Sequence, residues 1–221
     1  MLRMLMDGSF EWGMLPFILL GFAALVFVTT PVHEWAHAFV ADRLGDDTPY
    51  RNGRLTLNPF KHFDPFGTAM LVLFGFGYAK PVPVNARNFR NPRTGMALTA
   101  LAGPVSNLLM AYICVVLFRI VILVTSNTLV LSYASLFLIT ILAQINIGLA
   151  IFNLLPIPPL DGSHILSLIL PAKWRFYMAQ YQQYIRFALI LLVFSGVLSR
   201  PLWYLSDFIL NLFFVLAGFG F

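Results

Sequence analysis

The residues best suited to do chemistry form an H-E-x-x-H pattern, in which His33 and His37 flank Glu34. On a helix, side chains four residues apart lie on one face, so the two imidazoles can bind one zinc ion. Glu34 is one step around the helix, beside the position that a catalytic zinc keeps open for water. The pattern predicts one zinc ion per chain, held by His33 and His37, with Glu34 as the catalytic group that takes and returns the proton.

A simpler interpretation of these residues is a pair of buried histidines whose rings are hydrogen-bonded to backbone carbonyls. Three ionisable groups, however, lie within five residues of an otherwise apolar helix. A charge at bilayer depth costs several kcal/mol and is usually retained for function. We therefore favour the metal site.

A third protein ligand must come from elsewhere, because catalytic zinc usually has three protein ligands. His62 and Asp64 are possible, but they lie in a polar loop where they could simply be solvated. Asp161 follows a proline-rich stretch, and His164, three residues later, is a fourth candidate that could instead support a ligand by contacting it. The choice between them depends on membrane topology.

Topology favours Asp161 as the third ligand. If the stretch 65–79 does not cross the bilayer, helices at 94–124 and 129–155 go out and come back, and Asp161 arrives at the membrane face of His37. If 65–79 did cross, Asp161 would be about 30 Å away across the hydrocarbon. A shared ion therefore requires an even number of crossings between the two motifs.

The composition is that of an integral, multi-pass membrane protein, with 59% hydrophobic residues, 10% charged residues and a mean hydropathy of +0.82. The net charge of +5 does not predict nucleic-acid binding, because the basic residues form no stripe interleaved with aromatics. Eight of the fourteen lie between the first two long apolar runs, which places that region and the adjacent site on the cytoplasmic side. The single cysteine, Cys114, is assigned to packing.

The predicted fold is an all-α polytopic membrane protein with about five to six transmembrane helices. Short membrane-associated β-strands are expected near the active site, one of them at 54–57, where polar and apolar residues alternate. The stretch 65–79 is short for a crossing and is interpreted as re-entrant. The remaining expectations are long helices at 14–44, 94–124 and 129–155, a short helix at 162–170, an interfacial stretch at 173–186, and one or two further spans divided at Arg200 and Pro201.

Three patterns together resemble the site-2 proteases, which are intramembrane zinc metalloproteases. They are the H-E-x-x-H pattern, the pair Gly103 and Asn107, and the run Asn153-x-x-Pro156-x-Pro158-x-Leu160-Asp161-Gly162. The resemblance spans roughly 32–162. It implies that Asp161 is the third ligand and that Asn153 contacts the substrate backbone near the reacting carbonyl.

The resemblance is to the short prokaryotic type, which has neither a PDZ domain nor a nucleotide-sensing domain. It implies a single protease domain over 1–221, with a catalytic core at about 14–171 and C-terminal helices at about 172–221. The expected partners are transmembrane protein or peptide substrates and the lipid bilayer, in a prokaryotic inner membrane. The sequence does not indicate an oligomeric state.

Four further residues are candidates for substrate binding, each with a structural alternative. Val82 and Val84 alternate with prolines, so they could offer one strand edge to an unwound substrate, or form an edge guarded against aggregation. Asn153 could stabilise an oxyanion or cap a broken helix. Asn107 could belong to the site or make an interhelical hydrogen bond.

Two other functions would use the same residues. An ion or proton transporter could carry its cargo along the intramembrane His, Glu and Asp side chains, but transporters usually show repeated halves, and no repeat is visible here. A structural zinc site would have a closed shell of four ligands, whereas this sequence supplies three ligands and a free carboxylate. Intramembrane peptide hydrolysis is therefore the favoured function.

Overall fold

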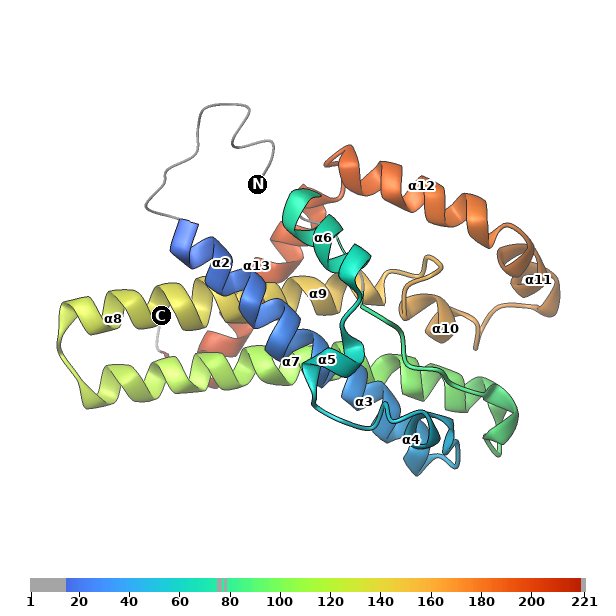
Figure 1. Cartoon of the computed structure of the whole chain (residues 1–221). Coiled ribbons are helices and arrows are strands. Elements are labelled where there is room, and N and C mark those ends of the chain that lie inside the picture. Colours follow the sequence, from blue (N-terminus) through green and yellow to red (C-terminus); the bar gives the residue numbers. More distant parts are fainter. Residues whose placement is uncertain (1–14, 75–76, 78, 220–221) are drawn as a thin grey trace.

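The computed structural model describes residues 15–74, 77 and 79–219, and this part of the chain is helical without any β-strand (Figure 1). The first helical rod consists of α2 (Leu15–Ala24), a π-helical turn η2 (Leu25–Thr29) and α3 (Thr30–Arg43). These segments join into one run of 29 residues, long and apolar enough to cross a membrane. The helix predicted at 14–44 is confirmed over the described residues.

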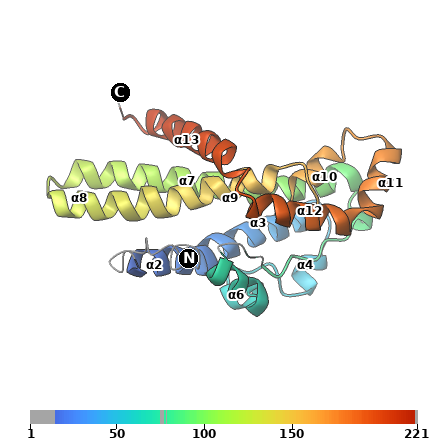
Figure 2. The same ribbon diagram turned by 90° about the horizontal axis from the view of Figure 1, so that it is seen from above.

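Two long antiparallel rods follow the loop region. The first is α7 (Pro92–Val124), and the second is built from α8 (Thr128–Ala134), the π-helical η4 (Ser135–Ala143) and α9 (Gln144–Leu154). Both rods pass the length and hydropathy test for a span, and their bounds agree with the predicted helices to within two residues. Figure 2 shows them lying between α13 on one side and the α2–α3 rod on the other.

Local sequence explains where these rods begin and end. The Asn91 side chain accepts a hydrogen bond from the N–H of Thr94, and the Asn127 side chain accepts from the N–H groups of Leu129 and Val130. Asparagine at such a position satisfies donors that a helix start leaves free. The third rod ends before Pro156, because proline lacks the N–H that would continue the ladder.

The loop between α3 and α7 contains only short elements: α4 (Thr48–Arg51), α5 (Pro59–His62), α6 (Pro65–Phe74) and the 3-10 turn η3 (Ala86–Asn88). At about 1.5 Å per residue, α6 is about 15 Å long, half of what a crossing needs. The end of the predicted re-entrant stretch, at 75, 76 and 78, lies outside the described residues. A non-crossing α6 leaves the even number of crossings that a shared ion requires.

The predicted β-strands are wrong for the described residues. The stretch 54–57 forms bends and irregular chain, because the Arg54 side chain turns inward to backbone carbonyls and no neighbouring strand pairs with it. Residues 81–85 form an extended chain in which Val82 and Val84 are half-buried while Pro81, Pro83 and Asn85 are exposed. This alternation is that of a strand, but the segment has no ladder partner.

The C-terminal part contains α10 (Gly162–Leu166), α11 (Ala172–Gln180), α12 (Gln182–Phe194) and α13 (Ser199–Leu216). The last two helices are bent by 78° relative to each other, and only together are they long and apolar enough to cross a membrane. The described chain therefore has three candidate spans, or four if the bent pair is one span, and not the five to six predicted. Apolar composition alone did not reveal that the chain turns sharply between Phe194 and Ser199.

A compact apolar core joins the two antiparallel rods to α13. It contains Cys114 and Val115 of α7, Ile147 and Ile151 of α9, and Leu210 of α13. Cys114 is buried here as a free thiol, which confirms its assignment to packing. The core keeps α9 packed against α7 in the antiparallel direction and thereby brings the chain after α9 back beside α3.

This topology predicts the outcome of cysteine labelling from the two sides of a membrane. In a Cys114→Ala background, Asn52→Cys and Lys173→Cys should react with an impermeant maleimide from one side, and Ser126→Cys should react from the other. All three positions are exposed, and position 126 lies in the turn between α7 and α8 at the far end of the rods. Labelling of positions 52 and 173 from opposite sides would contradict the fold.

Candidate metal centre

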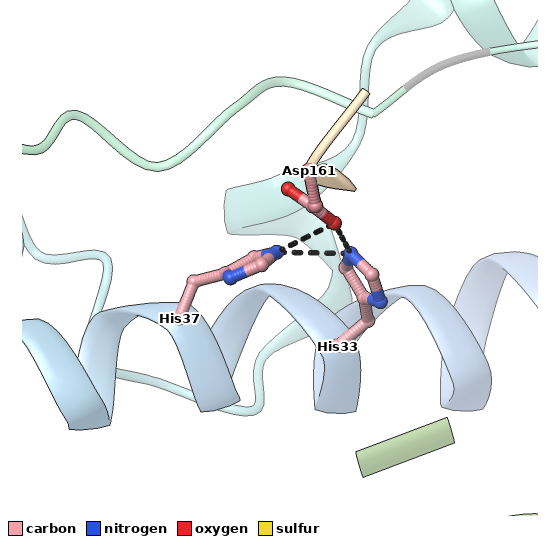
Figure 3. Close-up of side chains that lie close together, drawn as sticks. All are labelled: His33, His37 and Asp161. Atoms are coloured by element: carbon pink, nitrogen blue, oxygen red, sulfur yellow. Dashed lines mark hydrogen bonds and ion pairs between the residues drawn. The ribbon is translucent and has the colours of Figure 1, made fainter. Parts of the chain in front are cut away.

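Three ligand atoms converge between α3 and the turn that follows α9 (Figure 3). The Nε2 atoms of His33 and His37 are 3.0 Å apart, and Oδ2 of Asp161 lies 3.4 Å from the first and 3.5 Å from the second. The two histidines are 7% and 9% exposed. The structure thus brings together the residues predicted as ligands from positions 124 residues apart in the chain.

The spacing of these atoms fits a zinc ion. With bonds of about 2.0–2.2 Å, two ligands of a tetrahedral zinc are about 3.3–3.6 Å apart. The observed separations of 3.0, 3.4 and 3.5 Å are close to those values. Two imidazoles and a carboxylate are also a ligand set of catalytic zinc sites, in which a fourth position remains for water.

The carbonyl of Thr99 determines which nitrogen of His37 faces the site. Nδ1 of His37 is 2.7 Å from the backbone oxygen of Thr99, which can only accept, so this nitrogen carries the proton. In the neutral ring Nε2 then presents its lone pair to the other two ligand atoms. Thr99 lies on α7 five residues before Pro104, which lacks the N–H that would bond the neighbouring carbonyl of Ala100.

Asn107 has the same role for His33. Its amide lies 3.1 Å from Nδ1 of His33, and the residue is fully buried. His33 can present the Nε2 lone pair to a metal only if Nδ1 carries the proton, and this proton then needs an acceptor, which the flipped Asn107 amide supplies as Oδ1. We assign the flipped orientation, which makes this contact an interhelical hydrogen bond that orients a ligand.

Gly103 allows α7 to approach the two imidazoles. A Cβ atom at this position would lie 2.4 Å from Nε2 of His37 and 2.5 Å from Cε1 of His33. Those distances are far shorter than any contact between unbonded heavy atoms, so no other residue fits without moving a ligand. Gly103 therefore lets α7 pack closely against the two imidazole rings.

Asp161 reaches the histidines because the chain turns tightly after α9. A Cβ atom on Gly162 would lie 2.2 Å from the backbone oxygen of Leu154, so the start of α10 is pressed against the end of α9. The turn is held by N–H groups of Leu160 and Ser163, which donate to the carbonyls of Ile157 and Leu160. The backbone of this turn therefore positions the Asp161 carboxylate next to the two histidines.

Glu34 lies beside the three-atom cluster without belonging to it. Its Oε2 accepts a hydrogen bond of 3.2 Å from the N–H of Val82, in the extended segment before α7. The N–H of Val84 has no hydrogen-bond partner among the described residues. The N–H groups of Val82 and Val84 were both candidates for pairing with a substrate, and that of Val82 is already bonded to Glu34.

No hydrogen bond joins the other predicted residues to the ligand atoms within the described part of the chain. The Nδ2 of Asn153 donates to the carbonyl of Leu149 in its own helix and keeps one hydrogen free. His62 is buried and bonded through Nε2 to the carbonyl of Thr56, and Asp64 accepts from the N–H of Gly67. His164 is largely exposed, and its ring makes no hydrogen bond within the described part of the chain.

Sequence reasoning missed the carbonyl of Thr99, because a backbone acceptor has no residue signature. A weak signal was available: Thr99, Gly103 and Asn107 follow one another at intervals of four on a helix, so they share a face. The structure shows that this face of α7 lies against the histidines of α3.

Replacing Gly103 should disrupt the metal centre. Gly103→Ala places a methyl group on the ligand rings, so we expect zinc affinity to fall by at least about tenfold, the lower range for altered support of a ligand. Zinc content of the purified protein is the measurement. The matched control is Gly148→Ala on α9, where a Cβ would meet nothing within 4 Å. Equal zinc content in the two variants would contradict the geometry.

Replacing Asn107 should weaken zinc binding in a similar way. Asn107→Leu removes the acceptor for His33, and loss of such a partner typically costs about 10- to 100-fold in metal affinity. Asn146→Leu is the control, because Asn146 is also fully buried but bonds Thr29 and the carbonyl of Leu142, not a ligand. Competition with a chelator of known affinity would measure both, and similar losses would rule out a specific role for Asn107.

Comparison with known proteins agrees with this chemistry. Residues 118–195, from the last turns of α7 to the end of α12, match Peptidase family M50. The chain is 42% identical over 195 residues to "Putative zinc metalloprotease YwhC" of Bacillus subtilis (strain 168), covering 85% of this chain and 88% of that protein.

Two proteins named "Putative zinc metalloprotease Rip2" are also similar. The one from Mycolicibacterium smegmatis is 29% identical over 174 residues, which cover 76% of this chain and 64% of that protein. The one from Mycobacterium tuberculosis H37Rv is 29% identical over 176 residues, covering 78% of this chain and 66% of that protein. No solved structure is significantly similar. The three-ligand geometry and the extent of these matches show that the chain belongs to peptidase family M50, the site-2 protease family, and is a membrane-embedded zinc metalloprotease.

Proposed function

We propose that this protein is an intramembrane endopeptidase that hydrolyses peptide bonds within or near the transmembrane segments of membrane proteins. The observation that carries the proposal is the place of the metal centre: His33 and His37 belong to a 29-residue apolar helix. They are covered by a second apolar rod, α7. A peptide bond that reaches these atoms must come from the apolar phase or from its boundary.

The residues of the site divide the chemistry between them. His33, His37 and Asp161 would hold zinc, which supplies Lewis acidity and activates a water molecule when it is bound. Glu34 accepts the proton of that water at its carboxylate and passes it to the nitrogen of the leaving amine. Thr99 and Asn107 keep both imidazoles in the tautomer whose Nε2 faces the site.

Two further groups act on the substrate. The free hydrogen of Asn153 Nδ2 is available to stabilise negative charge that develops on the reacting carbonyl. The N–H of Val84 is available to pair with the backbone of an unwound substrate, which must replace the hydrogen bonds of its own helix. Val82 contributes by donating to Glu34, so it orients the proton-transfer group next to the pairing segment.

The proposed orientation places the site towards the cytoplasm of a prokaryotic cell, in the inner membrane. Its support is the eight basic residues between the first two long apolar runs of the sequence, since loops rich in lysine and arginine stay on the cytoplasmic side. His37 lies six residues before the end of α3, next to this basic loop. Transmembrane proteins and the bilayer are the proposed partners.

The competing functions are less well supported. A transporter is disfavoured because the chain belongs to a peptidase family and is similar to proteins named as zinc metalloproteases. A structural zinc site would need a fourth ligand, whereas the metal-ligating cluster among the described residues has three members.

Two substitutions separate metal binding from proton transfer. Glu34→Gln should retain one zinc ion per chain and lower kcat for a transmembrane reporter by at least about 100-fold, as expected when the proton-transfer group is lost. Asp161→Ala should lose both zinc and activity, because a charged ligand is removed. Zinc analysis and reporter cleavage in proteoliposomes measure both effects.

The matched control for Glu34→Gln is Asp42→Asn, a carboxylate-to-amide change near the end of the same helix, outside the ligand cluster. It should leave zinc content and cleavage unchanged. Turnover by Glu34→Gln at the wild-type rate would rule out its role in proton transfer. A wild-type enzyme that cleaves soluble peptides but no transmembrane reporter would reject the intramembrane substrate class and leave the peptidase activity intact.

A further inference from the structure

The extended segment Lys80–Asn85 is held at three points by groups that are distant in sequence. At its start, the N–H of Lys80 donates to the carbonyl of His62 at 2.9 Å, and the Lys80 carbonyl accepts from Arg54 at 3.4 Å. In the middle, the N–H of Val82 donates to Glu34. At its end, the N–H of Asn85 donates to Oδ2 of Asp46 at 2.7 Å. Both ends are thus anchored by a buried charged side chain.

Arg54 is 7% exposed and has no acidic partner among the described residues. Its Nη1 donates to the carbonyls of Lys61 and Lys80 instead. A buried guanidinium is costly unless hydrogen bonds compensate it, so its placement is specific. Arg54 connects the end of α5 to the start of the extended segment.

Asp46 is fully buried and anchors the other end. Besides Asn85 it accepts from the N–H of Thr48 at 3.2 Å and from Nδ2 of Asn88 at 2.7 Å. Burial by itself raises the pKa of this carboxyl, but the hydrogen bonds from Thr48, Asn85 and Asn88 hold the pKa below its ordinary value. The N–H of Asp46 donates to the carbonyl of Ala41, so Asp46 is attached to the helix that carries Glu34.

An isolated strand needs such anchors. The segment has no ladder partner, and Pro81 and Pro83 remove two of its donors. A free segment of this kind would lose conformational freedom on pairing with a substrate, and this loss would weaken binding. Fixing both ends removes that loss before the substrate arrives.

We propose that Arg54 and Asp46 are positioning residues that hold Lys80–Asn85 extended beside Glu34, so that the backbone of Val84 can pair with an unwound substrate. This inference rests on the proposed function. Neither residue touches the ligand atoms, so both act on substrate binding through the segment. Loss of either anchor should raise KM for substrates that pair with the segment and should leave the metal centre intact.

The test compares Arg54→Gln and Asp46→Asn with the controls Arg51→Gln and Asp47→Asn. The control residues form an exposed ion pair in the same loop, with 74% and 47% of the side chains exposed, and do not contact the segment. Each enzyme is assayed on a transmembrane reporter in proteoliposomes and on a quenched tetrapeptide, which is too short to pair with Val84. Zinc content is measured in parallel.

We expect both anchor variants to keep one zinc ion per chain and to raise KM for the transmembrane reporter. The increase should be about tenfold to a hundredfold, the size expected for a lost hydrogen bond to a charged group, with kcat within about threefold of wild type. Tetrapeptide hydrolysis and both controls should not change. An unchanged KM for the reporter would overturn the proposal. Loss of zinc, or an equal loss of kcat on both substrates, would also overturn it, because it would show a general structural role.

If Asp46→Asn does not fold, Asn88→Ala tests the same anchor. This substitution leaves Asp46 charged and introduces no new unpaired polar group into the interior. Asn88 is exposed and donates to Asp46, so its loss should raise the reporter KM by about two- to tenfold without changing tetrapeptide hydrolysis. An unchanged reporter KM in this variant would count against the proposal.

Hydrogen exchange on the Glu34→Gln enzyme tests substrate pairing separately from the role of Arg54 and Asp46. If bound reporter does not protect the amide of Val84 from exchange, the pairing of substrate with Val84 is rejected, regardless of the results for the Arg54 and Asp46 variants.

Discussion

The arrangement of this protein depends on one electrostatic constraint. Three atoms with lone pairs, from His33, His37 and Asp161, meet within 3.5 Å of one another between apolar helices. Without a cation they would repel one another in a medium that screens charge poorly. A zinc ion would remove this repulsion, and these three atoms could hold it while a fourth position stays available for water. The buried polar groups on α7 and the glycine that lets α7 approach are explained by this constraint.

The proposed intramembrane cleavage also requires a peptide backbone in an extended form near water. The loop between α3 and α7 meets that need on the polar side of the metal centre. It is short of regular structure, yet Arg54 and Asp46 are buried in it and bonded to its backbone. Val82 connects this loop to Glu34. The apolar rods therefore hold the metal ligands, and the polar loop orders the segment proposed to receive the substrate.

The parts of the fold that could be predicted are those with local causes. The long helices were located because their apolar runs end at residues such as Asn127 and Pro156, which act within one turn of the chain. The prediction of a strand at 54–57 was wrong, because four residues of alternating polarity do not form a strand unless a second strand lies beside them to pair with. The five to six predicted spans are not confirmed, because hydropathy does not show how sharply a chain bends, as the described chain does by 78° between α12 and α13.

By itself the sequence determined the long helices and led to the prediction of the ligand types and of Glu34 as the proton-transfer group, because helical spacing and proline chemistry act over short distances. It also favoured Asp161 through an argument about crossings. Only the tertiary structure decided that Thr99 and Asn107 orient the imidazoles, that Gly103 faces the ligand rings, and that Val82 contacts Glu34. Those contacts join residues 48 to 74 positions apart, and no local pattern encodes which faces of two helices will meet.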